Sequence, residues 1–270
     1  MEYCIFKTAL VVYCISTAVF AVSMLAKRVA LAKLAAAALG FAVLLHTVFI
    51  LWHWAVSGIS PVVNIYEALS FVAWAVSGSY LVFQAKTKTS VLGAFVSPPV
   101  LLLMIAASAG IAGPGEIDSS LETYWVTVHV IFTLTGTAFF ALACCAALMY
   151  LVQDRLIRKR KVSDFIRLLP SLGDLDKINH VSVVWGFLLL TVGIVSGSFW
   201  ARTAWGEHLL WDAKQVATLA AWVLCALLLH QRLAIGWKGK RAAYLSIGAF
   251  IILLFSFVGV NMFFPTVHRF

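Results

Sequence analysis

Charged side chains are scarce in this sequence. Asp, Glu, Lys and Arg make up 11% of its 270 residues, whereas hydrophobic residues make up 63%. A soluble globular domain carries about 25% charged residues. A chain of this length cannot bury so much apolar surface and still present a polar exterior to water. The composition therefore argues against a soluble globular fold and predicts an all-α polytopic integral membrane protein.

Motifs for several common chemistries are also missing. The five cysteines include no Cys-x-x-Cys pair, which argues against a zinc site or a dithiol redox centre. The sequence has no paired-carboxylate motif, no Ser/His/Asp set and no glycine-rich phosphate loop. It has no internal repeat, and no connector is long enough to hold a separate soluble domain. We therefore expect a single transmembrane domain over residues 1–270.

Apolar runs long enough to span a bilayer, about 20 residues each, occur eight times. The first run ends in Lys27 and Arg28 rather than at a small-residue cleavage site, so we expect a transmembrane helix and not a cleaved signal. Pro98 and Pro99 are expected to bend or break the fourth helix. The expected helices cover residues 8–26, 34–56, 67–85, 90–112, 125–152, 181–199, 216–236 and 242–263.

Basic residues are unevenly distributed among the connectors. Those after the first, third, fifth and seventh helices hold 16 of the 20 Lys and Arg residues. The positive-inside rule places these connectors in the cytoplasm, and therefore both termini on the extracytoplasmic side. The net charge of +9 is then explained by loops that face anionic membrane lipid, and not by a nucleic-acid-binding surface.

The connector between the sixth and seventh helices has an unusual composition. The stretch "SGSFWARTAWGEHLLWDAKQ", residues 196–215, holds Trp200, Trp205 and Trp211 among several charged side chains. Tryptophan is common at the membrane interface. Indoles also offer a flat apolar surface to a large planar ligand. From the residues alone, both interpretations stay open.

The histidines lie at different expected depths. His129 and His268 are expected at the same outer surface as the tryptophan connector, whereas His46 and His230 are expected inside the second and seventh helices. An ionisable residue within a span is a functional candidate, although a neighbouring helix can also satisfy a neutral imidazole. Imidazole is a common axial ligand of haem iron. Two outer histidines beside a tryptophan connector would suit a bis-histidine haem site.

Residues Gly186 to Arg232 resemble the tryptophan-rich signature of the CcsA/ResC cytochrome c assembly proteins, which belong to a wider haem-handling group that includes CcmC and CcmF. The family motif usually has Pro and Glu at the positions of Ala213 and Gln215. The resemblance extends, in the same order along the chain, over roughly residues 60 to 270. The further segments that carry it are "PVVNIYEALSFVAW" (61–74), "WVTVHV" (125–130), "LPSLGDLDKINHVSVVWGF" (169–187) and "GVNMFFPTVHRF" (259–270).

The resemblance implies that the protein binds haem b and presents it at the outer membrane face for covalent attachment to apocytochrome c, in the System II pathway. It implies a subunit of a holocytochrome c synthase, which forms haem–cysteine thioethers together with a ResB/CcsB-like membrane subunit. By position in the motifs, the implied ligands of haem iron are His129, His268 and His230. The implied haem contacts are Trp200, Trp205, Trp211 and Asp212, with His46 as a candidate ligand opposite His230 and Arg202 as a candidate partner of a haem propionate.

Two other functions remain open at this stage. One is a HemX-like membrane regulator of haem biosynthesis, which shares this short architecture. The other is a haem transporter with the same tryptophan connector. All three functions imply a location in the cell inner (plasma) membrane or an equivalent energy-transducing membrane, with the tryptophan connector on the extracytoplasmic side.

Overall fold

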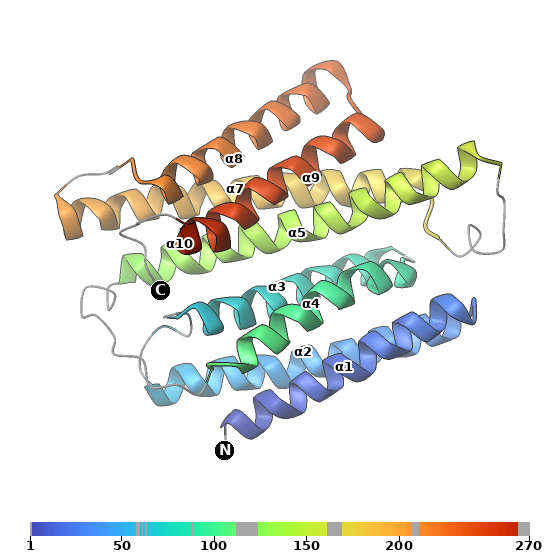
Figure 1. Cartoon of the computed structure of the whole chain (residues 1–270), viewed down its shortest axis with the longest axis horizontal. Coiled ribbons are helices and arrows are strands. Elements are labelled where there is room, and N and C mark those ends of the chain that lie inside the picture. The colour runs from blue at the N-terminus through green and yellow to red at the C-terminus, as the bar shows by residue number, and fades with distance from the viewer. Residues whose placement is uncertain are drawn as a thin grey trace.

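Eight membrane-spanning helices make up most of the described chain (Figure 1). The computed structural model describes residues 2–57, 60, 62, 64–87, 89–111, 124–160, 169–206 and 211–263, without the side chains of residues 204, 205, 261 and 262. The elements are α1(Glu2–Leu25), α2(Val29–Ser57), α3(Ile65–Lys86), η1(Ser90–Leu92), α4(Gly93–Ser108), α5(Tyr124–Arg158), α7(Leu172–Trp205), α8(Ala213–His230), η3(Gln231–Ile235), α9(Lys240–Leu254), η4(Phe255–Gly259) and α10(Val260–Phe263).

These helices confirm the predicted all-α membrane architecture with eight spans. The predicted helix ends were less accurate. The helix α7 begins at Leu172 rather than at residue 181, because Ser171 caps it by accepting a hydrogen bond from the Asp174 backbone N–H at 3.1 Å. Apolar content locates the part of a helix that lies in the bilayer, whereas capping residues decide where the helix begins.

The two prolines of α4 do not break the helix, which runs from Gly93 to Ser108 through Pro98 and Pro99. Pro99 has no N–H to donate to the carbonyl of Phe95. The Cys145 thiol on α5 donates to that carbonyl instead, at 3.6 Å. A neighbouring helix thus satisfies a backbone group that proline leaves without a partner, as is common within membranes.

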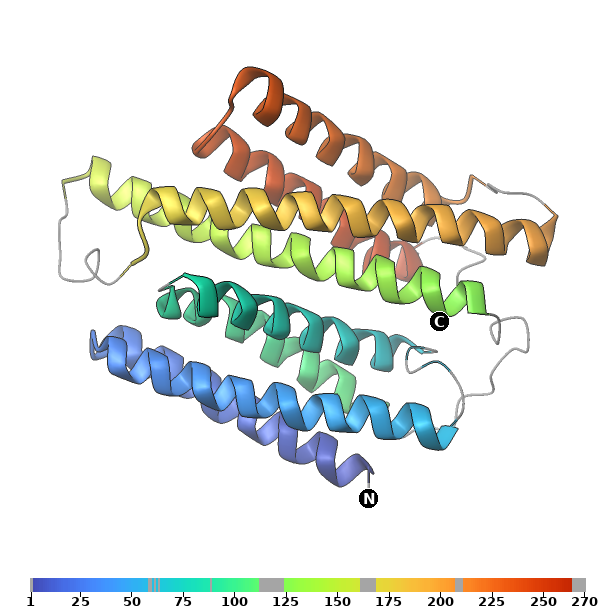
Figure 2. The ribbon, with the colours of Figure 1, turned by 180° about the vertical axis from the view of Figure 1, so that it is seen from behind.

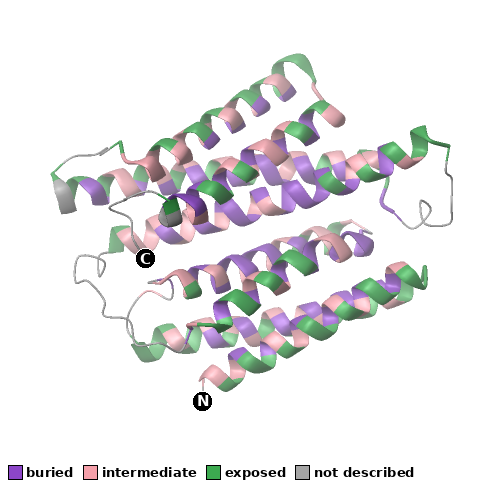
Figure 3. Ribbon diagram, viewed as in Figure 1, coloured by how far each residue is buried: buried purple, intermediate pink, exposed green. Residues whose placement is uncertain are grey.

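The bundle has two halves that meet along α5. We call α1 to α4 the N-terminal half and α5 to α10 the C-terminal half (Figures 1 and 2). The helix α5 contributes Leu142 and Ala146 to the core of the N-terminal half, and Phe140 and Ala143 to the core of the C-terminal half. Figure 3 shows its buried residues along most of its length. The helix α5 therefore joins the two halves through side chains on two faces.

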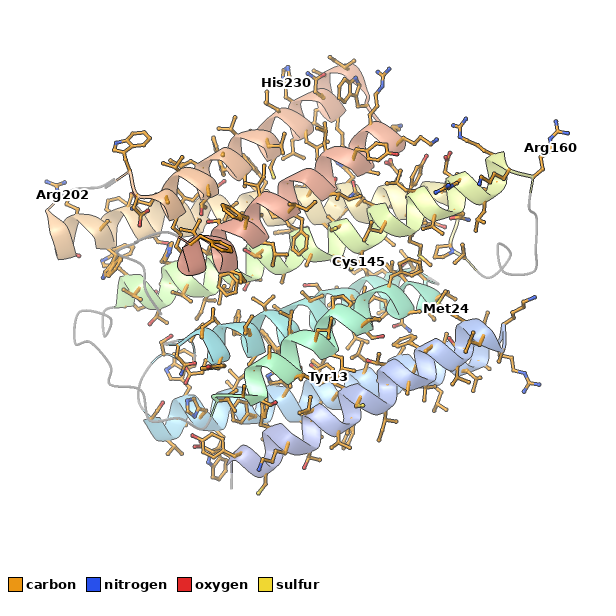
Figure 4. The ribbon with its side chains drawn as sticks, viewed as in Figure 1. Tyr13, Met24, Cys145, Arg160, Arg202 and His230 are labelled. Atoms are coloured by element: carbon orange, nitrogen blue, oxygen red, sulfur yellow. The ribbon has the colours of Figure 1, made fainter. Side chains whose placement is uncertain are left out.

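Because the number of spans is even, the first and last described helices begin and finish on the same side of the bundle (Figures 1 and 2). We call this side the terminal end. Glu2 and Phe263 lie there. The opposite end, which we call the basic end, holds the last residues of α1, α3, α5 and η3, and Figure 4 shows Arg160 there. The location of the basic end in the cytoplasm stays a prediction from the positive-inside rule.

Candidate functional site

A cavity of about 270 Å³ lies between α5, α7 and α8 at the terminal end. The start of α5 contributes His129 and Thr133, the end of α7 contributes Gly197, and the first turn of α8 contributes Lys214 and Gln215. The cavity therefore joins one of the histidines predicted to bind haem to the segment predicted to form the haem platform.

The His129 side chain is held by a backbone carbonyl. Its Nδ1 lies 2.7 Å from the carbonyl oxygen of Gly193. A carbonyl oxygen only accepts, so Nδ1 carries the proton, and in the neutral ring Nε2 carries the lone pair. Metal-binding histidines commonly donate their second ring N–H to a backbone carbonyl, which fixes the tautomer and the ring orientation. This geometry equips His129 to bind a metal ion through Nε2.

Two glycines let α7 approach the histidine side of α5. A Cβ atom at Gly197 would lie 2.5 Å from His129 Nδ1, and one at Gly193 would lie 2.3 Å from Thr133 Oγ1. Both distances are too short for a side chain to fit without displacing its neighbour. The sequence analysis did not identify these positions, although the small-x-x-x-small spacing of Gly193 and Gly197 is a signal of close helix packing in membranes.

The cavity combines apolar walls with polar side chains. Ile194, Val195 and Leu219 supply apolar surface, and Lys214 supplies an ammonium group. The Thr133 hydroxyl is buried and has no hydrogen-bond partner within the described part of the chain. An unsatisfied buried hydroxyl is unfavourable by about 1–3 kcal/mol. These features suit a ligand with an apolar body and an anionic, hydrogen-bonding edge.

The first turn of α8 is fixed by a reciprocal cap. Asp212 is the N-cap, and its Oδ1 accepts a hydrogen bond from the Gln215 N–H at 2.8 Å. The Gln215 Oε1 in turn accepts from the Trp211 N–H at 3.1 Å. Glutamine and glutamate both serve at this position of a capping box. The Gln215 side chain here bonds the N–H of Trp211, the residue before the N-cap, and the cap holds Lys214 at the cavity.

The three tryptophans of the connector lie in different environments. Trp200 is buried, with 6% of its surface exposed, whereas Trp211 is 68% exposed and has a φ of 53°. Neither of the two lines the cavity. Trp205 is the last residue of α7, and its side chain lies outside the described structure. The joint role of the three indoles as a haem platform stays a prediction.

His46 and His230 lie in different halves of the bundle. His46 is fully buried in α2, where its Nε2 is 2.8 Å from Ser70 Oγ and its Nδ1 is 3.3 Å from Tyr13 OH. His230 is exposed at the end of α8 near the basic end (Figure 4), about 26 Å along the helix from Ala213. Figures 1 and 2 show α2 and α8 at opposite edges of the molecule. The structure does not bring the two histidines together.

Two further predicted site residues lie away from the described cavity or outside the described chain. Arg202 is exposed on the last turn of α7, and Figure 4 shows it at the end of the molecule, pointing away from the other helices. His268 lies outside the described residues. The roles assigned to both residues therefore stay predictions.

Comparison with known proteins identifies the family. The model of the family described as cytochrome C assembly protein matches residues 62–268, which include every helix from α3 onward. The chain belongs to this family. Three curated relatives, each named cytochrome c biogenesis protein CcsA, support the assignment. They come from Chlorella vulgaris (28% identity, covering 86% of this chain and 84% of the relative), Synechococcus sp. strain CC9902 (30%, covering 81% and 80%) and Chlamydomonas reinhardtii (29%, covering 86% and 67%).

Proposed function

We propose that this protein binds haem b through His129 at the terminal end and presents it for covalent attachment to apocytochrome c. Family membership supports a role in cytochrome c biogenesis. The single observation that carries the haem-binding step is the His129 ring, whose Nδ1–H donates to the Gly193 carbonyl at a cavity wall. Haem supplies the vinyl groups to which the cysteine thiols of apocytochrome c add, and the protein supplies ligation and orientation.

Each group in the cavity has a part in this proposal. His129 Nε2 would hold the iron, and Lys214 with the Thr133 hydroxyl would hold a propionate carboxylate. The cavity volume of about 270 Å³ is slightly below the roughly 300–1,000 Å³ typical of small-molecule sites, so the cavity would hold only part of the haem. His268 and the connector indoles would hold the remainder of the haem.

A partner subunit completes the proposed system. His230 lies exposed on the lateral surface of the bundle, and His46 is too far across the molecule to complete an iron site with it. These positions favour an opposing ligand from a ResB/CcsB-like membrane subunit. We propose that the two subunits form a holocytochrome c synthase in the inner (plasma) membrane or an equivalent energy-transducing membrane, with the terminal end on the extracytoplasmic side.

Iron ligation is tested by titrating the detergent-purified protein with haem and measuring the Soret absorbance of the bound haem. Replacing His129 with Ala removes the ligand, so we expect haem affinity to fall at least 10-fold. Mutating even a residue that only supports a metal ligand lowers metal affinity about 10–100-fold. Added imidazole should restore the band. His53→Ala is the control, because His53 lies outside the cavity near the same end. Wild-type affinity and normal cytochrome c maturation in the His129→Ala variant would contradict the proposal.

The proposed contact between Lys214 and a carboxylate has a separate test. Lys214→Met should weaken haem binding about 10–100-fold, the range expected for losing a hydrogen bond to a charged group. Haem dimethyl ester has no carboxylate charge, so wild type and variant should bind it equally. Lys7→Met, an exposed change on α1, is the control. If the variant loses affinity equally for both ligands, Lys214 acts on the shape of the cavity and not on a carboxylate.

A further inference from the structure

A second cavity, of about 480 Å³, lies at the basic end between the last turns of α5 and the start of α9. Arg155 and Arg158 line it from α5, Lys159 lines it from the turn directly after α5, and Lys240 lines it from α9. The helix α5 has 35 residues and is therefore about 52 Å long, whereas the hydrocarbon core of a bilayer is about 30 Å thick. The basic turns of α5 thus extend beyond the hydrocarbon to the level of lipid headgroups.

The cavity has a large excess of positive charge. Asp154 is the one carboxylate among its lining residues, and it binds Arg158 Nε at 3.0 Å and Lys240 Nζ at 2.8 Å. One carboxylate against four cations leaves three positive charges in excess. Arg155 lies on the last turn of α5, and Lys159 directly follows the helix, with its N–H donating to the Arg155 carbonyl at 3.1 Å. The two like charges therefore lie close together at this end of α5. The walls therefore favour the binding of an anion.

The same cavity has apolar surface on its lateral side. Val152 of α5 and Tyr244 of α9 line it, and both are exposed within membrane-spanning segments. Exposed apolar side chains of a membrane helix contact acyl chains. Tyrosine is also typical of the membrane–water interface, where its ring meets hydrocarbon and its hydroxyl meets headgroups. The cavity thus joins a cationic wall to an apolar surface that faces lipid.

We infer that this cavity binds an anionic phospholipid. Arg155, Lys159 and Lys240 contact the headgroup phosphate, and an acyl chain covers Val152 and Tyr244. Guanidinium groups bind phosphate through charge-assisted hydrogen bonds, and basic pockets between membrane helices are known to accept anionic headgroups. A soluble phosphate would satisfy the charges but leave the apolar surface unused. The bound lipid would bridge α5 and α9 and reduce the repulsion among the basic side chains.

Native mass spectrometry of the detergent-purified protein, with added phosphatidylglycerol or phosphatidylcholine, tests this inference. The variant Arg155→Gln/Lys159→Gln removes two cations and keeps both ion pairs of Asp154. Each basic side chain near a membrane surface contributes about 1 kcal/mol, so we expect phosphatidylglycerol binding to weaken about 30-fold. The matched control, Arg28→Gln/Lys177→Gln, removes two exposed cations from the basic end outside the cavity and should bind like wild type.

Three outcomes would overturn the inference. The first is equal phosphatidylglycerol binding by the variant and the control. The second is equal binding of phosphatidylglycerol and phosphatidylcholine by the wild type. The third is displacement of phosphatidylglycerol by millimolar inorganic phosphate, which would identify a site for soluble phosphate. A second variant, Arg155→Lys/Lys159→Arg, keeps both charges and should keep the bound lipid, which separates loss of charge from damage to the fold.

Discussion

Gly197 has no side chain, and the ring of His129 occupies the space that one would need. The ring is oriented from two sides: the Gly193 carbonyl holds Nδ1, and the bare backbone at Gly197 leaves room for the imidazole. The position of a candidate iron ligand thus depends on residues that contribute no functional group of their own. At the scale of single residues, the shape of α7 matters as much as the identity of the histidine.

Replacing Gly197 with Ala should displace the His129 ring, because the added Cβ would lie 2.5 Å from Nδ1. Breaking the hydrogen bond to Gly193 removes the group that orients the ring, and supporting interactions of this kind are worth about 10–100-fold in metal affinity. We expect haem affinity, measured by Soret titration, to fall within that range.

Gly40→Ala is the matched control, since its Cβ would meet no atom within 4 Å. That change should leave haem affinity unaltered and stabilise α2 by about 1 kcal/mol through helix propensity. Normal affinity in Gly197→Ala would show that the position of the His129 ring does not depend on this close approach.

The sequence identified His129 as a candidate ligand but not the residues that surround it. Gly193 is 64 positions away along the chain, and its contact with His129 depends on how α5 packs against α7. Lys214 was missed as a cavity residue for the same reason. Residue type and expected depth are properties of one position, whereas a cavity wall requires the relative position of three helices.

The start of α8 illustrates how one helix end can organise a site. Asp212 was predicted to contact haem, and in the structure its carboxylate caps the helix that carries Lys214 and Gln215. The hydrogen bond from the Gln215 N–H gives Asp212 a structural role at the start of α8. The sequence contained the required signal, because an Asp followed three residues later by Gln is the pattern of a capping box.

Removing this cap should loosen the first turn of α8. Asp212→Ala is expected to destabilise the helix by about 1 kcal/mol and to increase hydrogen exchange at residues 213–216. Gln215→Glu should behave like wild type, because either residue serves in the capping box. Hydrogen exchange measured by mass spectrometry checks both variants, and unchanged protection in Asp212→Ala would contradict the assigned capping role.

Across the whole molecule, a polar network near the basic end ties the C-terminal half together. Arg232, with 8% of its surface exposed, donates to Asp176 Oδ1 at 2.7 Å and to Asn179 Oδ1 at 3.0 Å. Asp176 Oδ1 also accepts from the Gly239 N–H at 2.9 Å, and Asn179 donates to the Ala143 carbonyl at 2.9 Å. The network joins α5, α7, η3 and the residue before α9.

Arg232→Met should be strongly destabilising, because it leaves Asp176 without its charged partner. Breaking one side of a buried ion pair costs about 3–5 kcal/mol. The double variant Arg232→Met/Asp176→Asn removes both charges and should lose less stability than Arg232→Met alone. Thermal unfolding in detergent measures the difference, with the exposed change Lys177→Gln as control. A double variant less stable than Arg232→Met would contradict the ion-pair explanation.

The number of spans and their alternating direction followed from apolar runs and charge, because the bilayer imposes a length and a composition on every crossing. The division into two halves around α5 did not follow from them. Leu142 and Phe140 are both apolar and only two positions apart, yet they pack into different cores. Which face meets which neighbour depends on side-chain shape, and a uniformly apolar helix shows no pattern that reveals it.

The glycines that face α5 also determine how far the candidate site lies below the surface of the molecule. Gly186 fits against Phe140, Gly193 against Thr133 and Gly197 against His129, so the two antiparallel helices interlock at matching intervals. Sliding α7 by one turn, about 5.4 Å, would bring side chains into two of the three places, because Gly193 and Gly197 are one turn apart and only one can take the other's place. The depth of His129 is therefore fixed by the interlocked helices and not by the connector. Substitutions confined to the connector between α7 and α8 can therefore change which side chains lie beside the site without moving the His129 imidazole.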